Sequence, residues 1–386
     1  MNGYRKIPCV IQRGGTSKGI FLHEQNLPKD PDKRKKVILA IFGSPDRRQI
    51  DGLGGADPLT SKVAIISTSS KPDIDIDYTF GAVDINKPIV DFRGNCGNIS
   101  SGVGPFSIDE GLVKAIGSET IVRIFNTNTK KVLKAYVPTY EGKTEYLGDY
   151  AIAGVPGIGA KILLDYSGTV GAATGKILPT GNTIDNIFIP SMGNLEISIV
   201  DVANPVCFIS AESLNLVGVE WPDDEKILKL LNEIERIRGI SAEMIGLTKN
   251  AESARTETPA IPLLAIISKS ANYISFTDKS NISADKIDFV SRVFYMQEMH
   301  KTYSATAAIC TAVAAKIDGT IVSQTMLRKS ANDKMVRIGH PSGIITIDID
   351  LSKSEKGYEL KKAALGRTSR RIMEGFVFVP EKIYIE

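Results

Sequence analysis

The sequence predicts an α+β protein of two similar domains, and three observations support this prediction. The chain has 386 residues, more than a single hydrophobic core usually organises. Short strand patterns and glycine-rich turns fill most of it, with only a few helical segments. The segments "TSKGIFLHEQNL" and "ANPVCFISAESL" form an internal echo, because aligning Phe21 with Phe208 pairs Ser17 with Asn204 just before a predicted strand. Such a repeat favours two domains of related structure.

The first half of the chain contains four recognisable elements. We expect two strands joined by a glycine-rich turn within residues 7–27 and a helix at 31–43 that ends at a glycine. A strictly alternating strand follows at 73–80, where aspartates occupy the solvated face. Residues 119–140 have the pattern of a hairpin of two strands.

The middle of the chain is rich in glycine, between residues 153 and 182. It fails the test for a phosphate-binding loop, because Val170 stands where the first glycine is required and Ile177 follows the lysine. We therefore interpret it as a linker or crossover and expect domains at residues 1–184 and 185–386.

The second half resumes the strand pattern and adds two helices. One is amphipathic, with Asp223 or Asp224 as its N-cap. The other, at residues 302–317, is strongly apolar and is expected to be buried. Each half thus contains a helix of small residues.

The composition excludes several classes of protein. A content of 42% hydrophobic and 24% charged residues is typical of a soluble globular protein, and a net charge of +3 does not indicate a nucleic-acid surface. No apolar run approaches the ~20 residues of a membrane span, and the first residues lack the apolar core of a signal peptide. The four cysteines are far apart and only three histidines are present. We expect a cytoplasmic protein without a disulfide framework or a metal site.

The stretch "DFRGNCGNISSGVG", residues 91–104, surrounds Cys96 with glycine and asparagine and then begins a helix near Asn98 or Ser100. The start of a helix attracts a carboxylate and lowers the pKa of a nearby thiol. Glycines let a ligand approach the backbone closely. The segment therefore predicts a reactive thiol at a carboxylate site, although a buried structural cysteine in a tight turn gives the same pattern.

A second candidate for a reacting side chain is Lys62, which precedes an apolar strand in "DGLGGADPLTSKVAIIS". A lysine in a desolvated site can lose its proton readily enough to act as a base. An ordinary surface lysine at a strand edge is the alternative interpretation.

Seven segments, taken in order along the chain, resemble one family of enzymes. They are "IPCVIQRGGTSKGIFL", "DGLGGADPLTSKVAIIS", "GNCGNISSGVGPFSIDEGLV", "TGKILPTGN", "HKTYSATAAICTAVAA", "IGHPSG" and "RTSRRIMEG". Together they are similar to the 2-methylaconitate isomerase (PrpF-like) family, whose fold resembles that of diaminopimelate epimerase. The resemblance covers essentially the whole chain, and within the family it is strongest to the 3-methylitaconate Δ-isomerases.

The resemblance implies two domains, each a mostly antiparallel sheet wrapped around a central helix, with the active site in the interdomain cleft and the last strand crossing back to the first domain. Epimerases of this fold use two cysteines, each near the start of a central helix. Here Cys96 matches the first, but "KTYSAT" begins the second helix and Cys310 lies about two turns inside it. The two-thiol pattern is broken, which argues against a two-cysteine racemase or epimerase.

The resemblance also implies roles for individual residues. Lys62 and Cys96 are the expected proton-transfer pair, with Lys62 as the leading base and Cys96 as its partner acid or alternative base. Each central helix, with nearby amides, is expected to hold one substrate carboxylate. His300 can orient a carboxylate or relay a proton, or serve only in packing. The expected substrate-binding residues are Ser17, Lys18, Asn95, Gly97, Asn98, Asn204, His300, Ser304 and Thr306.

We therefore expect an isomerase, independent of metals and cofactors, that shifts a C=C bond in a branched unsaturated dicarboxylate, with 3-methylitaconate to 2,3-dimethylmaleate as the leading reaction. A 2-methylaconitate cis–trans isomerase or a 4-oxalomesaconate tautomerase are the alternatives within the family. A cysteine-nucleophile hydrolase is the alternative from another class, and it needs a histidine base such as His300 or His340. The expected partners are a small di- or tricarboxylate and further copies of the chain, not nucleic acid or a membrane.

Overall fold

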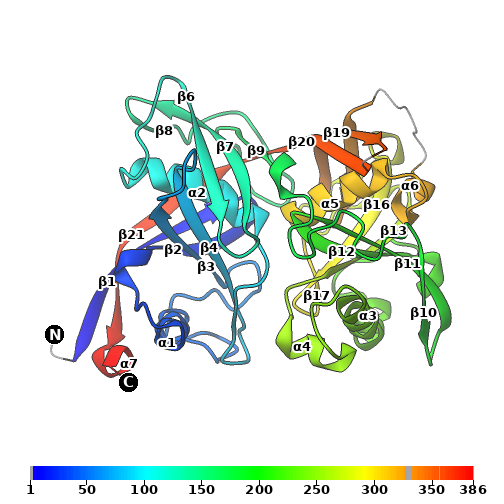
Figure 1. Cartoon of the computed structure of the whole chain (residues 1–386), viewed down its shortest axis with the longest axis horizontal. Coiled ribbons are helices and arrows are strands. Elements are labelled where there is room, and N and C mark those ends of the chain that lie inside the picture. The colour runs from blue at the N-terminus through cyan, green and yellow to red at the C-terminus, as the bar shows by residue number, and fades with distance from the viewer. Residues whose placement is uncertain (1–2, 327–332, 356, 386) are drawn as a thin grey trace. The chain divides into compact units, whose positions relative to one another are not determined.

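A computed structural model describes residues 3–326, 333–355 and 357–385 of the chain (Figure 1). The chain forms two compact units. The first contains the residues up to Ile152, the short segment Gly157–Leu164 and the chain from Gly366 onward. The second contains Ala153–Pro156 and Asp165–Leu365.

The first unit is built from strands with two longer helices among them. Its elements in chain order are β1 (Tyr4–Gly14), β2 (Ser17–His23), α1 (Pro31–Phe42), β3 (Lys62–Thr68), β4 (Ile76–Val83), β5 (Val90–Asp91), α2 (Gly97–Asp109), β6 (Glu119–Asn126), β7 (Lys131–Tyr140), β8 (Lys143–Thr144), β9 (Ile162–Asp165), β21 (Ser369–Pro380) and α7 (Glu381–Ile385).

The strands of this unit pair mostly antiparallel. β1 pairs antiparallel with β2, β3 with β4 and β6 with β7, while the pairs β2–β3 and β4–β6 are parallel. The last strand returns to this unit, because β21 pairs antiparallel with β1 from Tyr4 opposite Pro380 to Gly14 opposite Ser369.

Helix α2 is the central helix of the first unit. It is buried from Gly97 to Ile108 and packs against β1, β2, β3, β6, β7, β8 and β21. Glycines permit this close approach: a Cβ on Gly14 would lie 2.4 Å from the carbonyl oxygen of Asn98, and one on Gly102 would lie 2.7 Å from the ring of Phe21. The sheet therefore wraps around the helix, as the family resemblance implied.

The second unit repeats this plan. Its elements are β10 (Asp185–Ile189), β11 (Gly193–Val202), β12 (Asn204–Ser210), α3 (Glu225–Met244), α4 (Ala254–Glu257), β13 (Leu263–Lys269), β14 (Tyr273–Ile274), β15 (Asn281–Ile282), β16 (Phe289–Tyr295), β17 (Glu298–Met299), α5 (Ala305–Lys316), α6 (Ile321–Thr325), β18 (Met335–His340), β19 (Gly343–Ser354) and β20 (Gly357–Arg367).

The order of strand pairings is the same in both units. β11–β12 is antiparallel, β12–β13 parallel, β13–β16 antiparallel, β16–β18 parallel and β18–β19 antiparallel. The buried helix α5 packs against β11, β12, β18 and β19. Phe21 lies opposite Ala64 in the first unit and Phe208 opposite Ala265 in the second. The internal echo in the sequence is thus a structural repeat.

Several predicted elements form where local chemistry specified them. Asp30 caps α1 through its side chain, and the helix ends at Gly43, whose φ is 70°. The hairpin of β6 and β7 and the N-cap Asp224 of α3 also match the prediction. The alternating strand forms later than expected, at Ile76–Val83, because Asp73 has a positive φ of 58° and lies in a turn.

The limit between the units falls at Leu164 and Asp165, whereas we expected it between residues 184 and 185. The glycine-rich segment that follows is hydrogen-bonded to β11, since Gly171 N donates to Asp201 O at 2.8 Å and Asp201 N donates to Ile177 O at 3.0 Å. The sequence of this segment has no strong periodicity. Its backbone hydrogen bonds to β11 could therefore not be predicted from the residue pattern.

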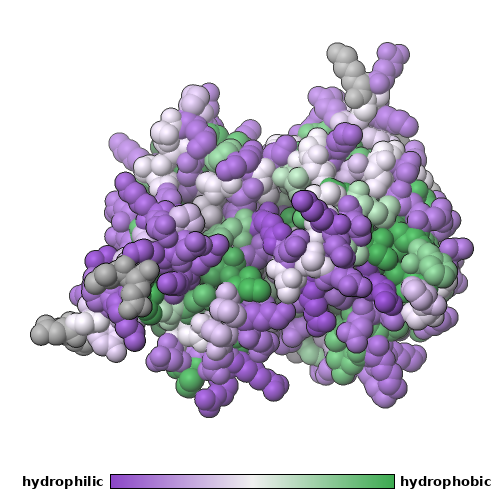
Figure 2. Space-filling model, turned by 60° about the horizontal axis from the view of Figure 1, so that its bottom comes forward, coloured by the Kyte–Doolittle hydropathy of each residue, from purple (hydrophilic) through white to green (hydrophobic). Residues whose placement is uncertain are grey.

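Each unit has its own apolar core. In the first, Val37, Ile41 and Phe42 of α1 pack with residues of β1, β2 and β3, and in the second, Ile234 and Ile237 of α3 pack with β11 and β13. Hydrophilic and hydrophobic residues are mixed over the surface seen in Figure 2. None of the helices in the described part of the chain combines the length and hydrophobicity of a transmembrane span.

The contact of Gly14 with α2 gives a stability prediction. Gly14→Ala forces the backbone of β1 away from Asn98, and we expect it to lower the free energy of unfolding by about 1–3 kcal/mol. Thermal and denaturant unfolding measure this. Gly375→Ala is the matched control on β21, since its Cβ would make an ordinary 3.4 Å contact with the sulfur of Met373. Equal stability of the two variants would contradict close packing of β1 on α2.

Candidate active site

Three side chains that the sequence singled out lie together in the first unit. Nζ of Lys62 donates a hydrogen bond to Oγ of Ser17 at 2.9 Å and another to Sγ of Cys96 at 3.4 Å. Lys62 and Ser17 are each 2% exposed and Cys96 is 7% exposed. Nitrogen and sulfur are therefore in direct contact at a buried place, a geometry that permits proton transfer between them.

The fold brings these residues together because each one begins an element. Ser17 is the first residue of β2, Lys62 is the first residue of β3, and Cys96 is the N-cap of α2. β2 and β3 are parallel neighbours, with Ile20 opposite Val63, so their first residues lie at the same edge of the sheet. Gly19 keeps this edge close, because a Cβ there would lie 2.7 Å from the carbonyl oxygen of Lys62.

Two asparagines lie at the start of α2: Asn95 just before the N-cap Cys96, and Asn98 in the first turn. Ser100 Oγ donates to Oδ1 of Asn95 at 3.2 Å and to the carbonyl oxygen of Cys96 at 2.9 Å. The thiol of Cys96 makes no capping hydrogen bond of its own within the described chain. The N–H groups of a first helical turn point out of the helix start, where they favour an anion. Cys96 thus lies at a helix start, a place in a fold that favours an anion.

Arg367 is a site neighbour that sequence analysis missed. Its Nε donates to Oδ1 of Asn98 at 3.0 Å, although the two residues are 269 positions apart. The only signal available was the segment "RTSRRIMEG", which begins with this arginine.

The second unit places its predicted residues in an equivalent arrangement. Asn204 begins β12, as Ser17 begins β2, and its Nδ2 donates to Oγ1 of Thr306 at 3.1 Å. Oγ of Ser304, the N-cap of α5, lies 2.9 Å from the same hydroxyl and accepts from Ala307 N. These three polar side chains form a neutral counterpart of the Lys62 cluster.

His300, Cys310 and Lys18 are found in other surroundings. Nδ1 of the buried His300 accepts from the backbone N of Thr302 at 3.1 Å, which stabilises its own turn. Cys310 is fully buried, its Sγ donates to Val200 O at 3.1 Å, and burial raises the pKa of this thiol. No hydrogen bond or ion pair in the described residues links the half-buried Lys18 side chain to Lys62 or Cys96.

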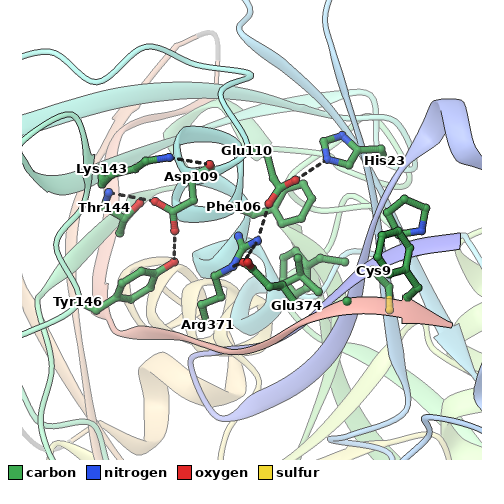
Figure 3. A pocket seen from close by; sticks show the side chains of 15 residues that line it. Cys9, His23, Phe106, Asp109, Glu110, Lys143, Thr144, Tyr146, Arg371 and Glu374 are labelled. Carbon is green, nitrogen blue, oxygen red and sulfur yellow. Dashed lines mark hydrogen bonds and ion pairs between the residues drawn. The ribbon is translucent and has the colours of Figure 1, made fainter.

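A cavity of about 760 Å³ lies at the opposite end of α2 (Figure 3). Its charged groups pair with one another: Glu110 contacts Nε2 of His23 at 2.9 Å and Nη2 of Arg371 at 2.5 Å, and Tyr146 OH donates to Oδ2 of Asp109 at 2.7 Å. Lys62 and Cys96, the expected proton-transfer pair, are not among its lining residues.

Metal-ligating groups do not gather in the part of the chain that the structure describes. No three His, Cys, Asp or Glu side chains there are placed to share one ion.

Known proteins share both the sequence and the fold. The PrpF protein family matches residues 4–380. The 3-methylitaconate isomerase of Eubacterium barkeri is 52% identical to this chain over 98% of each protein. The 4-oxalomesaconate tautomerase of Pseudomonas putida is 37% identical over 98% of this chain and 97% of that protein. The 2-methyl-aconitate isomerase of Cupriavidus necator is 35% identical over 97% of each.

Solved structures give the same relation. The crystal structure of a methylitaconate-delta-isomerase matches 100% of this chain and 98% of its own, with a TM-score of 0.80 and 49% identity. A hydroxyproline epimerase from Agrobacterium vitis matches 97% of this chain and 93% of its own with a TM-score of 0.61, and at 10% identity it shares the fold alone.

The cluster around Glu110 gives a pH prediction. Burial raises the pKa of this carboxyl, but the hydrogen bonds and charges of His23 and Arg371 outweigh burial and lower it. A lowered folded-state pKa adds stability above the unfolded value, and this stability is lost as the pH falls through the folded value. Between about pH 5 and pH 3, the melting temperature of Glu110→Gln should fall less than that of the wild type.

Glu119→Gln is the control, because Glu119 is an exposed carboxylate at the start of β6. Its melting curve should follow the wild type over the same range. Parallel pH profiles for the Glu110→Gln variant and the wild type would contradict the paired carboxylate.

Proposed function

This chain belongs to the PrpF protein family, and we propose that it is an isomerase that shifts a C=C bond by proton transfer in a branched unsaturated dicarboxylate. The proposed substrate is 3-methylitaconate and the proposed product is 2,3-dimethylmaleate, after the relative that is 52% identical. The observation that carries this proposal is the 3.4 Å contact between Nζ of Lys62 and Sγ of Cys96 in a buried site.

The reaction conserves every atom of the substrate. A proton leaves the methyl-bearing carbon, the electron pair spreads over the allylic system and the adjacent carboxylate, and a proton adds at the methylene terminus. A carbon next to a carboxylate is a very weak acid, so fixed N–H donors and positive charge must stabilise the enediolate intermediate. The reaction consumes no oxidant or reductant, and the proposal includes no cofactor.

Lys62 and Cys96 are the proposed proton-transfer pair. One of them removes the first proton and the other delivers the second, with Lys62 as the leading base. After each turnover one group has gained a proton and the other has lost one. Direct contact between Nζ and Sγ lets a proton pass between the two groups, and exchange of their N–H and S–H hydrogens with the solvent between turnovers brings solvent hydrogen to the product.

Two groups of residues are proposed to hold the substrate carboxylates. In the first unit these are the backbone at Gly97 and Asn98, with Ser17 and the neighbouring Lys18 and Asn95. In the second unit they are Asn204, Ser304 and Thr306, with His300 nearby in sequence. The support is that both groups lie at the start of a buried central helix, where N–H donors favour anions.

Other functions are ranked by their support. A 2-methylaconitate isomerase and a 4-oxalomesaconate tautomerase remain alternatives, since relatives with those names are 35% and 37% identical. A cysteine hydrolase is less favoured, because the polar side chain donating to Cys96 is a lysine and not a histidine. We further propose that the enzyme works in the cytoplasm as a homo-oligomer.

Proton NMR in deuterated water tests the proposal. The purified protein is incubated without added cofactor with 3-methylitaconate, 2-methylaconitate or 4-oxalomesaconate. We expect conversion of 3-methylitaconate with deuterium entering the new methyl group. Lys62→Ala and Cys96→Ala should each lower the rate by about 10²- to 10⁴-fold, because each removes one proton-transfer group.

Lys114→Ala and Cys9→Ala are the controls for loss of a lysine and a thiol outside the site, at an exposed position and in β1 respectively. Both should retain wild-type rates. If the wild-type protein converts none of the three substrates, the proposed function is overturned.

A further inference from the structure

Arg367, which lies late in the chain, makes a side-chain hydrogen bond to the start of the central helix α2. It is the last residue of β20 and is 4% exposed. Its Nε donates to Oδ1 of Asn98 at 3.0 Å, and its Nη1 donates to the carbonyl oxygen of Gly366 at 3.1 Å. Asn98 is 1% exposed and lies two residues after Cys96 in the first turn of α2. A buried guanidinium therefore lies one side chain away from the predicted carboxylate site.

This contact fixes which way the amide of Asn98 faces. Arginine has only donors, so the amide must turn its oxygen to Arg367 and direct its N–H₂ group away from the guanidinium. Donors are what a carboxylate requires. In the opposite orientation the N–H₂ group of Asn98 would face the guanidinium, which has no acceptor for it.

The amide of Asn98 has little room to rotate. A Cβ on Gly15 would lie 2.3 Å from Oδ1 of Asn98 and 3.1 Å from Cδ of Arg367, so the β1–β2 turn closes on this pair. Gly15 N donates to Thr368 O at 2.9 Å, which holds the turn against the residue after Arg367. The same turn leads into Ser17, which accepts the hydrogen bond from Lys62. The β1–β2 turn therefore contacts the Asn98 amide and also positions Ser17, the partner of Lys62.

Positive charge is the other contribution of Arg367. The substrate of the proposed function is a dianion, and its intermediate carries further negative charge. Lys62 alternates between charged and neutral forms if it serves as the base, whereas an arginine keeps its charge throughout. A permanent cation behind the first turn of α2 stabilises the anion in every step.

We propose that Arg367 is the positioning residue of the carboxylate site: it holds Asn98 by its oxygen so that the amide directs N–H donors to a carboxylate beside Cys96. The inference rests on the proposed function. A purely structural role, tying β20 to α2, would change stability without changing the preference of the site for a carboxylate. The experiments below separate the two roles.

Two variants of Arg367 test the hydrogen bond through steady-state kinetics. Arg367→Met removes every donor, and we expect KM to rise about tenfold with a smaller change in kcat. Arg367→Gln keeps a donor that can reach Oδ1 of Asn98, so its KM should lie between those of the Met variant and the wild type. Arg370→Gln removes an exposed charge three residues away and should leave KM unchanged. An unchanged KM in the Met variant would overturn the proposal, as would a loss of kcat alone.

A second readout does not depend on the natural substrate. Iodoacetate and iodoacetamide alkylate a thiol with loss of iodide, and they differ in that only iodoacetate carries a carboxylate. The rate of each at Cys96, located by peptide mass spectrometry, gives a carboxylate preference for the site. Arg367→Met should lower the ratio of iodoacetate to iodoacetamide rates about tenfold relative to the wild type. An unchanged ratio overturns the role of Arg367, whatever the activity.

Asn98→Asp covers the case in which Arg367→Met does not fold. Aspartate keeps an oxygen for Arg367 but replaces the N–H₂ donors with a negative charge, so the same ratio should fall. A ratio equal to the wild type in this variant overturns the proposal. If the ratios shift as expected while no substrate is converted, the proposed function fails and the positioning role stands.

Discussion

The proposed chemistry depends on one interaction, the contact between Nζ of Lys62 and Sγ of Cys96. It joins a strand start and a helix start that lie 34 residues apart in the chain and are almost fully buried. Burial of such polar groups is unfavourable unless each has partners, and here Ser17 supplies one. The parallel pairing of β2 with β3 and the close approach of β1 to α2 both serve to bring these three residues together.

The two units repeat one arrangement of strands and helix but differ in the polar side chains at equivalent places. Both units follow the same order of strand pairings around a buried helix of small residues. Ser17 and Asn204 occupy equivalent places, but Ser17 accepts a hydrogen bond from Lys62 whereas Asn204 donates one to Thr306. In the second unit Cys310 lies inside α5 and is fully buried. In the proposed function, the first unit supplies the proton-transfer pair and the second supplies neutral hydrogen-bonding groups.

Local signals predicted much of this from the sequence. Asp30 and Gly43 marked the ends of α1, glycines and asparagines marked Cys96, and the echo around Phe21 and Phe208 indicated the repeat. Arg367 could not be found this way, because its partner Asn98 is 269 residues away and no periodicity connects them. The limit at Leu164 and Asp165 differs from the expected one at residues 184 and 185, and an irregular segment held by backbone hydrogen bonds lies between the two positions.

The measurement that tests the proton-transfer pair most directly is deuterium exchange by the single variants in deuterated water. If Lys62 and Cys96 serve different carbons, one variant should exchange only the hydrogen on the methyl-bearing carbon of 3-methylitaconate. The other should exchange only methyl hydrogens of 2,3-dimethylmaleate, and isomer formation by both should be slowed by about 10²- to 10⁴-fold. Isomerisation at the wild-type rate by Lys62→Ala or Cys96→Ala would contradict the account.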